Sequence, residues 1–202
     1  MKFSIAVMLL LGMAGCSSAA KQAASQNAAT GSYRVLLSTS KGPIVIEVDR
    51  RLAPIGAQRF YELVKAKYFD GSRFYRVVPG FVVQWGAAAD PKVTQKWDVT
   101  IPDDPVKGSN TRGTVSFAAT DQPNSRSTHL FVNLGDNAKL DAMGFAPIGR
   151  VLSGMDAVDD IYPGYGEGPN QNMIAEDGNA YLEKEFPRLD YIRTARILTE
   201  SK

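Results

Sequence analysis

Cysteine and histidine are nearly missing from this chain of 202 residues, which contains one of each. The single cysteine, Cys16, cannot form a disulfide within the chain, so a disulfide framework is excluded. The single histidine, His129, has no second histidine or further cysteine with which to build a zinc site of the usual ligands. We therefore expect neither a metal nor any other cofactor.

An excess of either charge is also lacking. The chain has 23 Lys and Arg against 21 Asp and Glu, which gives a formal net charge of +2 at pH 7. A nucleic-acid-binding surface needs a concentration of basic side chains, and this balance does not indicate one. Nucleic acid is therefore not expected as a partner. No pattern typical of an oligomer stands out, so a monomer is expected.

The N-terminal apolar run, residues 5–13, is too short to cross a bilayer as a helix. It follows Lys2 and ends in Ala14-Gly15, directly before Cys16. This order of a charged, an apolar and a small-residue region predicts a secretory signal peptide over residues 1–15. Its last residues and the cysteine, Met-Ala-Gly-Cys, resemble a bacterial lipobox with Met where Leu is more usual, which implies that Cys16 is lipidated. A plain secreted protein with an incidental cysteine is the alternative.

Residues 16–31 are predicted to be the lipidated cysteine and a flexible tether. Apart from one Lys, residues 17–31 are Ala, Ser, Gln, Asn, Thr and Gly, a composition with too little apolar surface to become ordered. Several acyl chains on Cys16 would attach the protein stably to a membrane. The protein is therefore expected in the cell envelope, facing the periplasm. Ser17 stands where Asp is the commoner inner-membrane signal, which favours the outer membrane over the inner.

Residues 32–202 have the length of one domain. Runs of β-forming residues alternate with turn residues, and two stretches carry apolar residues at helical spacing. This pattern predicts a mainly β fold, a closed antiparallel β-barrel capped by two α-helices, although periodicity alone also allows a sandwich with attached helices. The predicted strands are 34–39, 44–48, 73–78, 81–85, 113–118, 130–134, 145–151 and 193–198, and the predicted helices are 54–68 and 155–161.

Residues 74–84, Phe-Tyr-Arg-Val-Val-Pro-Gly-Phe-Val-Val-Gln, are the most informative part of the chain. Arg76 and Gln84 interrupt an apolar, strand-forming run that Pro79-Gly80 breaks with a turn. A guanidinium on an apolar surface is costly unless it is paired. Arg76 therefore either reaches solvent or a carboxylate, or lies in an apolar groove that binds a polar ligand. These residues alone favour neither interpretation.

Three segments of the chain resemble the cyclophilins, a family of peptidyl-prolyl cis-trans isomerases. Residues 74–84 resemble the family's Phe-His-Arg-Ile-Ile-Pro-Gly-Phe-x-x-Gln signature, and residues 113–125 with 127–131 resemble the strand-loop-strand that lines its peptide groove. The resemblance spans about residues 34–199 and implies a closed eight-stranded antiparallel β-barrel with two helical caps. The third segment comprises Leu140-Asp141, residues 145–151 and Gly154-Met155.

The resemblance also implies a site that accelerates rotation about X-Pro bonds. Three residues would be catalytic: Arg76 donates to the imide nitrogen of the twisted amide, Phe81 walls the proline pocket, and Gln84 holds a substrate carbonyl and braces the guanidinium. For each apolar residue of the site, ordinary core packing is the alternative. The implied substrate-binding residues are Val82, Ala118, Ala119, His129, Phe131, Leu140 and Phe145.

The chain departs from the family pattern at several positions. His129 stands where the family has Gln, Trp85 where it has Gly, and Phe145 where many eukaryotic members have His. Lys139 replaces a Trp of those members, so tight binding of the cyclic inhibitor cyclosporin is not expected. The stretch 162–193 is longer than the minimal family pattern, and the sequence assigns it no role.

His129 is expected to form hydrogen bonds toward the bound peptide, in place of the usual Gln. If it titrates near neutral pH, activity would depend on pH. A hydrolase triad with Ser127 and either Asp121 or Asp136 can be imagined, but the chain has no Gly-x-Ser-x-Gly elbow, so this reaction is not expected.

The sequence thus predicts a lipid-anchored prolyl isomerase whose partners are proline-containing, unfolded or partly folded polypeptides of the cell envelope. A non-catalytic peptide-binding module or holdase chaperone is the main alternative, and the departures at His129 and Trp85 motivate it. A purely structural envelope lipoprotein is a third, but it would leave Arg76 in an apolar groove without an explanation.

Overall fold

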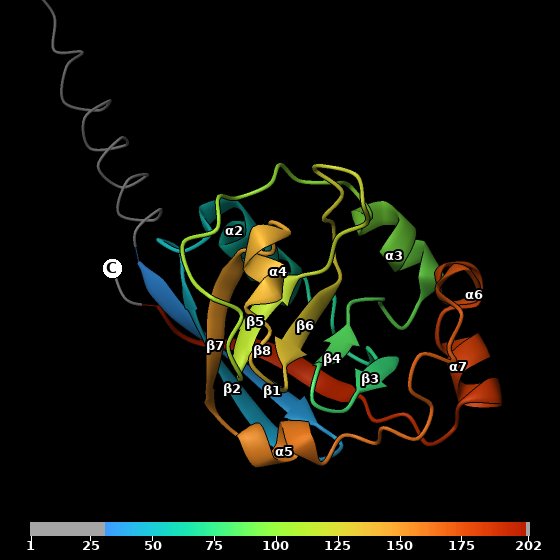
Figure 1. Cartoon of the computed structure of the whole chain (residues 1–202). Coiled ribbons are helices and arrows are strands. Elements are labelled where there is room, and N and C mark those ends of the chain that lie inside the picture. The colour runs from blue at the N-terminus through green and yellow to red at the C-terminus, as the bar shows by residue number, and fades with distance from the viewer. Residues whose placement is uncertain (1–30, 201–202) are drawn as a thin grey trace, which may run out of the picture.

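The computed structural model describes residues 31–200, which form a single eight-stranded antiparallel sheet with helices around it (Figure 1). The predicted signal peptide 1–15, the lipidation site Cys16 and all but the last residue of the predicted tether lie outside the described residues. The strand order is β3-β4-β6-β5-β7-β2-β1-β8. The strands are β1 Ser32–Thr39, β2 Gly42–Asp49, β3 Arg76–Val78, β4 Val82–Trp85, β5 Thr114–Phe117, β6 Leu130–Asn133, β7 Pro147–Ser153 and β8 Ile192–Glu200.

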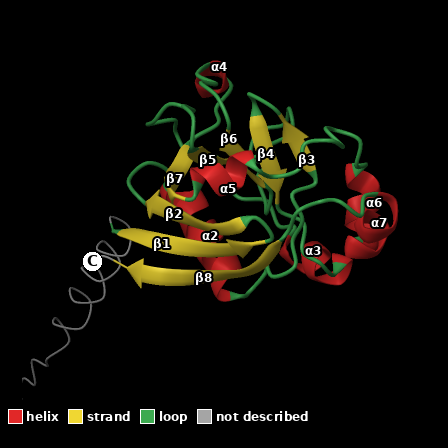
Figure 2. Ribbon diagram, turned by 90° about the horizontal axis from the view of Figure 1, so that it is seen from below, coloured by secondary structure: helices red, strands yellow, loops and turns green. Residues whose placement is uncertain are grey.

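The sheet curls into a half-barrel (Figure 2), and its two edge strands are β3 and β8. They are joined just before each strand begins, by an isolated bridge between Arg73 and Tyr191. The Ile192 N–H also donates to the Ser72 carbonyl at 2.8 Å. The predicted mainly β, eight-stranded antiparallel fold is confirmed, with closure by these few contacts rather than by a long ladder.

The two predicted helices are present as α2 Pro54–Lys65 and α5 Met155–Asp159. Pro54 begins α2, where its missing N–H removes no helical hydrogen bond, and the buried side chains of Phe60 and Leu63 face the core. The region between β4 and β5 and the unassigned stretch 162–193 contain further short helices. These are α3 Pro91–Trp97, α6 Gln171–Asp177 and α7 Asn179–Glu185, which lie together near β3 (Figures 1 and 2), while α4 Lys139–Ala142 follows β6.

The stretch 162–193 has a small hydrophobic cluster of its own, which explains how this long segment stays folded. Ile174 of α6 and Leu182 of α7 are buried there, each about as completely as residues of the main core. They pack with the buried ring of Tyr75, the residue before β3. The extra segment is therefore fixed against the strand that carries Arg76.

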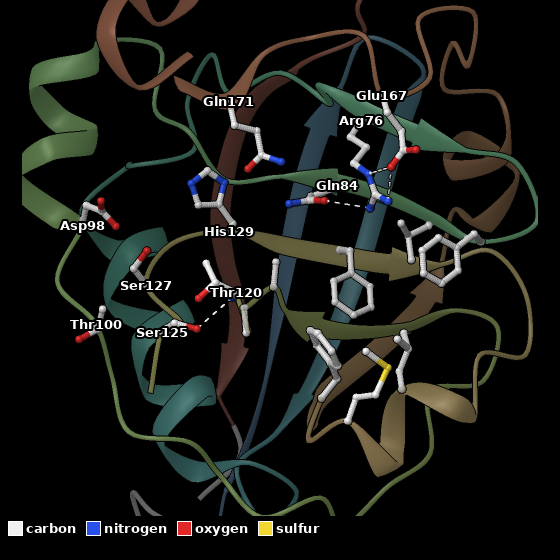
Figure 3. A pocket seen from close by; sticks show the side chains of 18 of the residues that line it. Arg76, Gln84, Asp98, Thr100, Thr120, Ser125, Ser127, His129, Glu167 and Gln171 are labelled. Carbon is white, nitrogen blue, oxygen red and sulfur yellow. Dashed lines mark hydrogen bonds and ion pairs between the residues drawn. The ribbon is translucent and has the colours of Figure 1, made fainter. Parts of the chain in front are cut away.

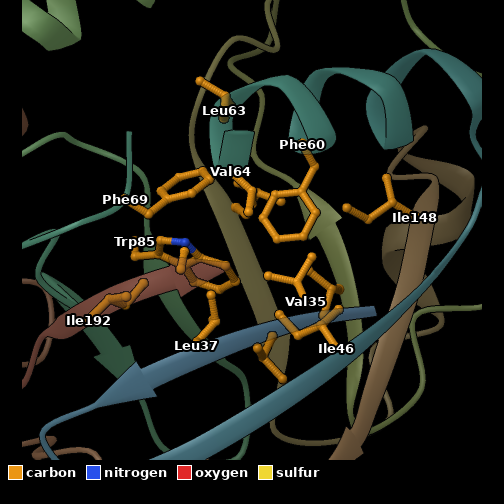
Figure 4. Close-up of a cluster of buried hydrophobic side chains, with 14 of the residues drawn as sticks. Val35, Leu37, Ile46, Phe60, Leu63, Val64, Phe69, Trp85, Ile148 and Ile192 are labelled. Carbon is orange, nitrogen blue, oxygen red and sulfur yellow. The ribbon is translucent and has the colours of Figure 1, made fainter. Parts of the chain in front are cut away.

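The main core lies between the sheet and α2, and Trp85 is one of its largest members (Figure 4). The Trp85 side chain is 0% exposed and contacts the rings of Phe69 and Phe74 at centroid distances of 6.5 and 5.9 Å. Successive strand residues face opposite sides of a sheet, so Gln84 and Trp85 point in opposite directions. The departure from the family pattern at Trp85 therefore lies in the core, and its side chain does not line the groove.

The N-terminus of α2 is capped from a distant part of the chain. The N-cap residue, Ala53, has no side chain that could accept a hydrogen bond, and the Asp104 carboxylate instead accepts from the N–H groups of Ile55 and Gly56 at 3.1 and 2.7 Å. A carboxylate at a helix N-terminus satisfies free N–H groups and opposes the positive end of the helix dipole.

We expect Asp104→Ala to lower the free energy of unfolding by about 1–2 kcal/mol, because it removes the only side-chain cap of these two N–H groups among the described residues. Urea denaturation measures the loss. Asp121→Ala, which removes an exposed carboxylate elsewhere, is the control and should change stability by less than about 0.5 kcal/mol. Equal stability of the two variants would contradict the capping role.

Candidate active site

An open groove with a volume of about 910 Å³ crosses the face of the sheet opposite the Trp85 side of β4. All of the predicted catalytic and substrate-binding residues line it: Arg76, Phe81, Val82, Gln84, Ala118, Ala119, His129, Phe131, Leu140 and Phe145. The groove also contains residues that the sequence did not single out for binding. These are Asp98, Thr100, Thr120, Ser125, Ser127, Met143, Glu167, Gln171 and Asn172.

One half of the groove is apolar. Val82, Phe131 and Leu140 form a separate buried cluster, on which Phe81 and Phe145 pack. The rings of Phe131 and Phe145 meet edge to face at a centroid distance of 5.8 Å. The walls of this half are therefore rigid hydrocarbon, which suits a small apolar ring such as that of proline.

Arg76 lies at the boundary between the apolar and the polar half (Figure 3). Arg76 of β3 is directly paired with Gln84 of β4 in the ladder, and its Nη1 donates to the Gln84 Oε1 at 3.2 Å. Its guanidinium carbon lies 5.7 Å from the centre of the Phe81 ring. On its other side the guanidinium is paired with Glu167, so both interpretations of Arg76 hold: it faces a groove, and it has a carboxylate partner.

A chain of hydrogen bonds continues from Arg76 through Gln84 and Tyr75 to His129. Because a guanidinium only donates, the Gln84 oxygen must face Arg76 and its NH₂ group must face Tyr75, to which it donates at 2.8 Å. The Tyr75 hydroxyl therefore has its own hydrogen free for the Nδ1 of His129, 2.7 Å away. Burial raises the pKa of Tyr75 far above its usual value, so this phenol keeps its hydrogen at neutral pH.

His129 is held in its neutral form by the same environment. Burial lowers the pKa of His129 below the ordinary value of 6.5, and the nearby Asp98 carboxylate opposes this shift without reversing it. With Nδ1 accepting from Tyr75, the single ring proton lies on Nε2. His129 therefore offers the groove an N–H donor, as the Gln usual in the family would.

We expect kcat/KM to be constant between about pH 8 and 7 and to fall only as the pH drops below the ordinary histidine pKa of 6.5. Protonation of His129 places a hydrogen on Nδ1, which can then no longer accept from Tyr75. Because the pKa of His129 is lowered rather than raised, the loss begins only below 6.5. NMR exchange spectroscopy on an X-Pro peptide measures the rate without a coupling protease, and His129→Gln should give a flat profile. Identical profiles of the two proteins would contradict this role.

The residues of the imagined hydrolase triad do not form one. The Nδ1 of His129 contacts the Tyr75 hydroxyl, and no carboxylate in residues 31–200 forms a hydrogen bond to the imidazole. Asp136 instead accepts from the backbone N–H of Arg112 at 3.2 Å. Within the same residues, no group of three or more His, Cys, Asp or Glu side chains is arranged to hold a metal ion.

The curled eight-stranded antiparallel sheet with a groove across one face is a cyclophilin-like fold. Comparison with known proteins also gives the family. A family model described as cyclophilin type peptidyl-prolyl cis-trans isomerase/CLD matches residues 34–177. The chain therefore belongs to the cyclophilin-type peptidyl-prolyl cis-trans isomerases. The predicted enzyme class is thereby confirmed.

Several curated and solved proteins are similar to this chain. Peptidyl-prolyl cis-trans isomerase A of Dickeya dadantii is 36% identical over 153 residues, which are 72% of this chain and 80% of the relative. Peptidyl-prolyl cis-trans isomerase B of Escherichia coli is 31% identical over 63% of this chain and 82% of its own length. A crystal structure of a Cryptosporidium parvum cyclophilin superposes with a TM-score of 0.61 at 18% identity, covering 83% of this chain and 98% of that protein. At this identity the structural likeness concerns the fold alone.

Proposed function

We propose that this enzyme lowers the barrier to X-Pro rotation by donating from Arg76 to the imide nitrogen of the twisted amide. The barrier of about 18–20 kcal/mol comes from amide resonance, and the nitrogen lone pair becomes a hydrogen-bond acceptor only when that resonance is lost. A donor at this position therefore stabilises the transition state more than either planar isomer. The observation that carries the proposal is a guanidinium held by Gln84 beside an apolar pocket.

The remaining groups of the groove would hold the substrate while the bond rotates. The apolar cluster around Phe131 would fix the proline ring. Ala118 and Ala119 would pair with the extended peptide through their backbones. The N–H of Ala118 already donates to the carbonyl of His129 at 2.9 Å, so in this proposal Ala118 contributes its carbonyl only.

The substrates of this proposal are proline-containing peptide segments of unfolded or partly folded polypeptides. A crystal structure of the Cryptosporidium parvum cyclophilin was determined in the presence of the dipeptide Ala-Pro, which is the same chemical class. The test is NMR exchange on an X-Pro peptide with this protein added. A rate no faster than the uncatalysed step would contradict catalysis, and suppression of aggregation without that acceleration would favour the holdase alternative.

We further propose that the enzyme acts in the cell envelope, where Cys16 anchors it as a monomer to a membrane, the outer one rather than the inner. The support is the sequence alone: a signal-like segment, a lipobox-like Met-Ala-Gly-Cys and a polar tether. No helix among residues 31–200 is long and apolar enough to cross a membrane. Fractionation of cells that produce the full chain or Cys16→Ala tests the anchor. The full chain should stay with the membranes and the variant should not.

A further inference from the structure

Glu167 belongs to the stretch 162–193 but contacts the proposed catalytic arginine. Both the Nε and the Nη2 of Arg76 bind the Glu167 Oε1, at 2.7 and 2.5 Å (Figure 3). The Glu167 side chain is 64% exposed, whereas that of Arg76 is 25% exposed. The carboxylate therefore approaches the guanidinium from the solvent side, and it also lines the groove.

Backbone hydrogen bonds hold the loop that carries Glu167 at the residues on both sides of it. The carbonyl of Gly166 accepts from the N–H of Val77 in β3 at 3.2 Å, and the N–H of Gly168 donates to the Tyr165 carbonyl at 2.8 Å. The Tyr165 ring packs edge to face on Phe186 at 5.1 Å. Glu167 is thus held next to the strand that carries Arg76, and its position does not depend on the ion pair alone.

This contact limits where the guanidinium can point. An arginine has five N–H donors, of which Glu167 takes one on Nε and one on Nη2, and Gln84 takes one on Nη1. One donor on each terminal nitrogen is left for a ligand in the groove. A long side chain that is otherwise free to change rotamer is in this way oriented before the substrate arrives.

The charge of Arg76 should survive this pairing. The interaction between an exposed carboxylate and a guanidinium is weakened by surrounding water, so Glu167 orients the cation without cancelling its field inside the groove. A carboxylate that instead competed with the substrate for the guanidinium would make the contact autoinhibitory. The two effects change the rate in opposite directions, so one measurement separates them.

We propose that Glu167 is a positioning residue, contributed by the extra segment, that orients Arg76 for donation to the substrate. This inference rests on the proposed role of Arg76 in catalysis. We expect Glu167→Ala to lower kcat/KM by about fivefold to tenfold, mainly through kcat, which corresponds to the loss of one oriented hydrogen-bonded contact. Glu167→Gln keeps an acceptor for Arg76 and should restore most of the rate.

Glu183→Ala is the matched control. Glu183 belongs to the same segment and forms the same kind of ion pair, with Arg73 at 2.8 Å, but it does not line the groove. Its removal should leave kcat/KM within about twofold of the wild type. If Glu183→Ala is as slow as Glu167→Ala, the segment acts through general structure and the proposal is overturned.

A double-mutant cycle with Arg76→Ala completes the test. If Glu167 acts only through Arg76, then Glu167→Ala should have no further effect once Arg76 is removed. A slow Arg76→Ala together with a Glu167→Ala variant as fast as, or faster than, the wild type would overturn the positioning role alone. An Arg76→Ala variant with the wild-type rate would instead contradict the proposed mechanism.

Discussion

Replacing Arg76 with alanine is expected to lower kcat/KM for X-Pro isomerisation by about 10²–10³-fold, the usual effect of removing one preorganised donor from an active site. The reaction breaks no covalent bond, so the groove can supply only shape and electrostatic stabilisation. Arg76 is the only Lys or Arg among the described residues that line the groove. Lys139 also lies over the Phe81 ring, at 5.2 Å, but it does not line the groove, so the loss should appear mainly in kcat.

The matched control is Arg34→Ala. Arg34 also lies on a strand, β1, and also pairs with a glutamate, Glu47, at 3.1 Å, but it is remote from the groove. Both variants should unfold at nearly the wild-type urea concentration, because partly exposed ion pairs contribute little to stability. NMR exchange on the same peptide gives the rates. A rate of Arg76→Ala within about threefold of the Arg34→Ala rate would contradict a catalytic role for the guanidinium.

Much of the fold could be predicted because its signals are local. The turn residues between β1 and β2 lie between two runs of alternating burial, and that alternation is visible as apolar residues at every second position. α2 likewise has Pro54 at its start and apolar residues at helical spacing. The order of the strands within the sheet is not a local property, and the sequence did not predict it; the closed eight-stranded barrel was implied only by the resemblance to a family.

The groove residues were identifiable for the same reason, since they lie in segments with recognisable spacing. Arg76 and Gln84 become neighbours through a tight turn, which the sequence shows as Pro79-Gly80. Glu167 was not identifiable, because it is 91 positions from Arg76 and its contact depends on the path of the intervening chain. The only available signal was a stretch, 162–193, too long and too rich in aromatic residues to be a simple loop.

The sequence contains the information needed to place Trp85. Gln84 is expected in the groove, and neighbouring residues of a strand face opposite sides of the sheet. Trp85 must therefore face the core whenever Gln84 faces the groove, and the structure shows this arrangement. The departure from the family pattern at Trp85 is thus a change in the core rather than in the groove.

Replacing Trp85 with glycine, the residue usual in the family, is consequently expected to lower the free energy of unfolding by about 3–5 kcal/mol. The change removes a large, fully buried ring from between Phe69 and Phe74 and leaves a cavity. Glycine also weakens a strand through its greater freedom in the unfolded chain. Urea denaturation measures the loss, and Trp97→Ala, which removes an indole only partly buried against the same core, should cost less.

Trp85→Phe separates stability from function, even if the glycine variant does not fold. Phenylalanine fills part of the same space and removes an indole N–H that has no hydrogen-bond partner among the described residues, so this variant should fold with a smaller loss of about 1–3 kcal/mol. Its kcat/KM per folded molecule should equal that of the wild type, because the side chain points away from the groove. A tenfold change in kcat/KM per folded molecule would show that Trp85 acts on the groove after all.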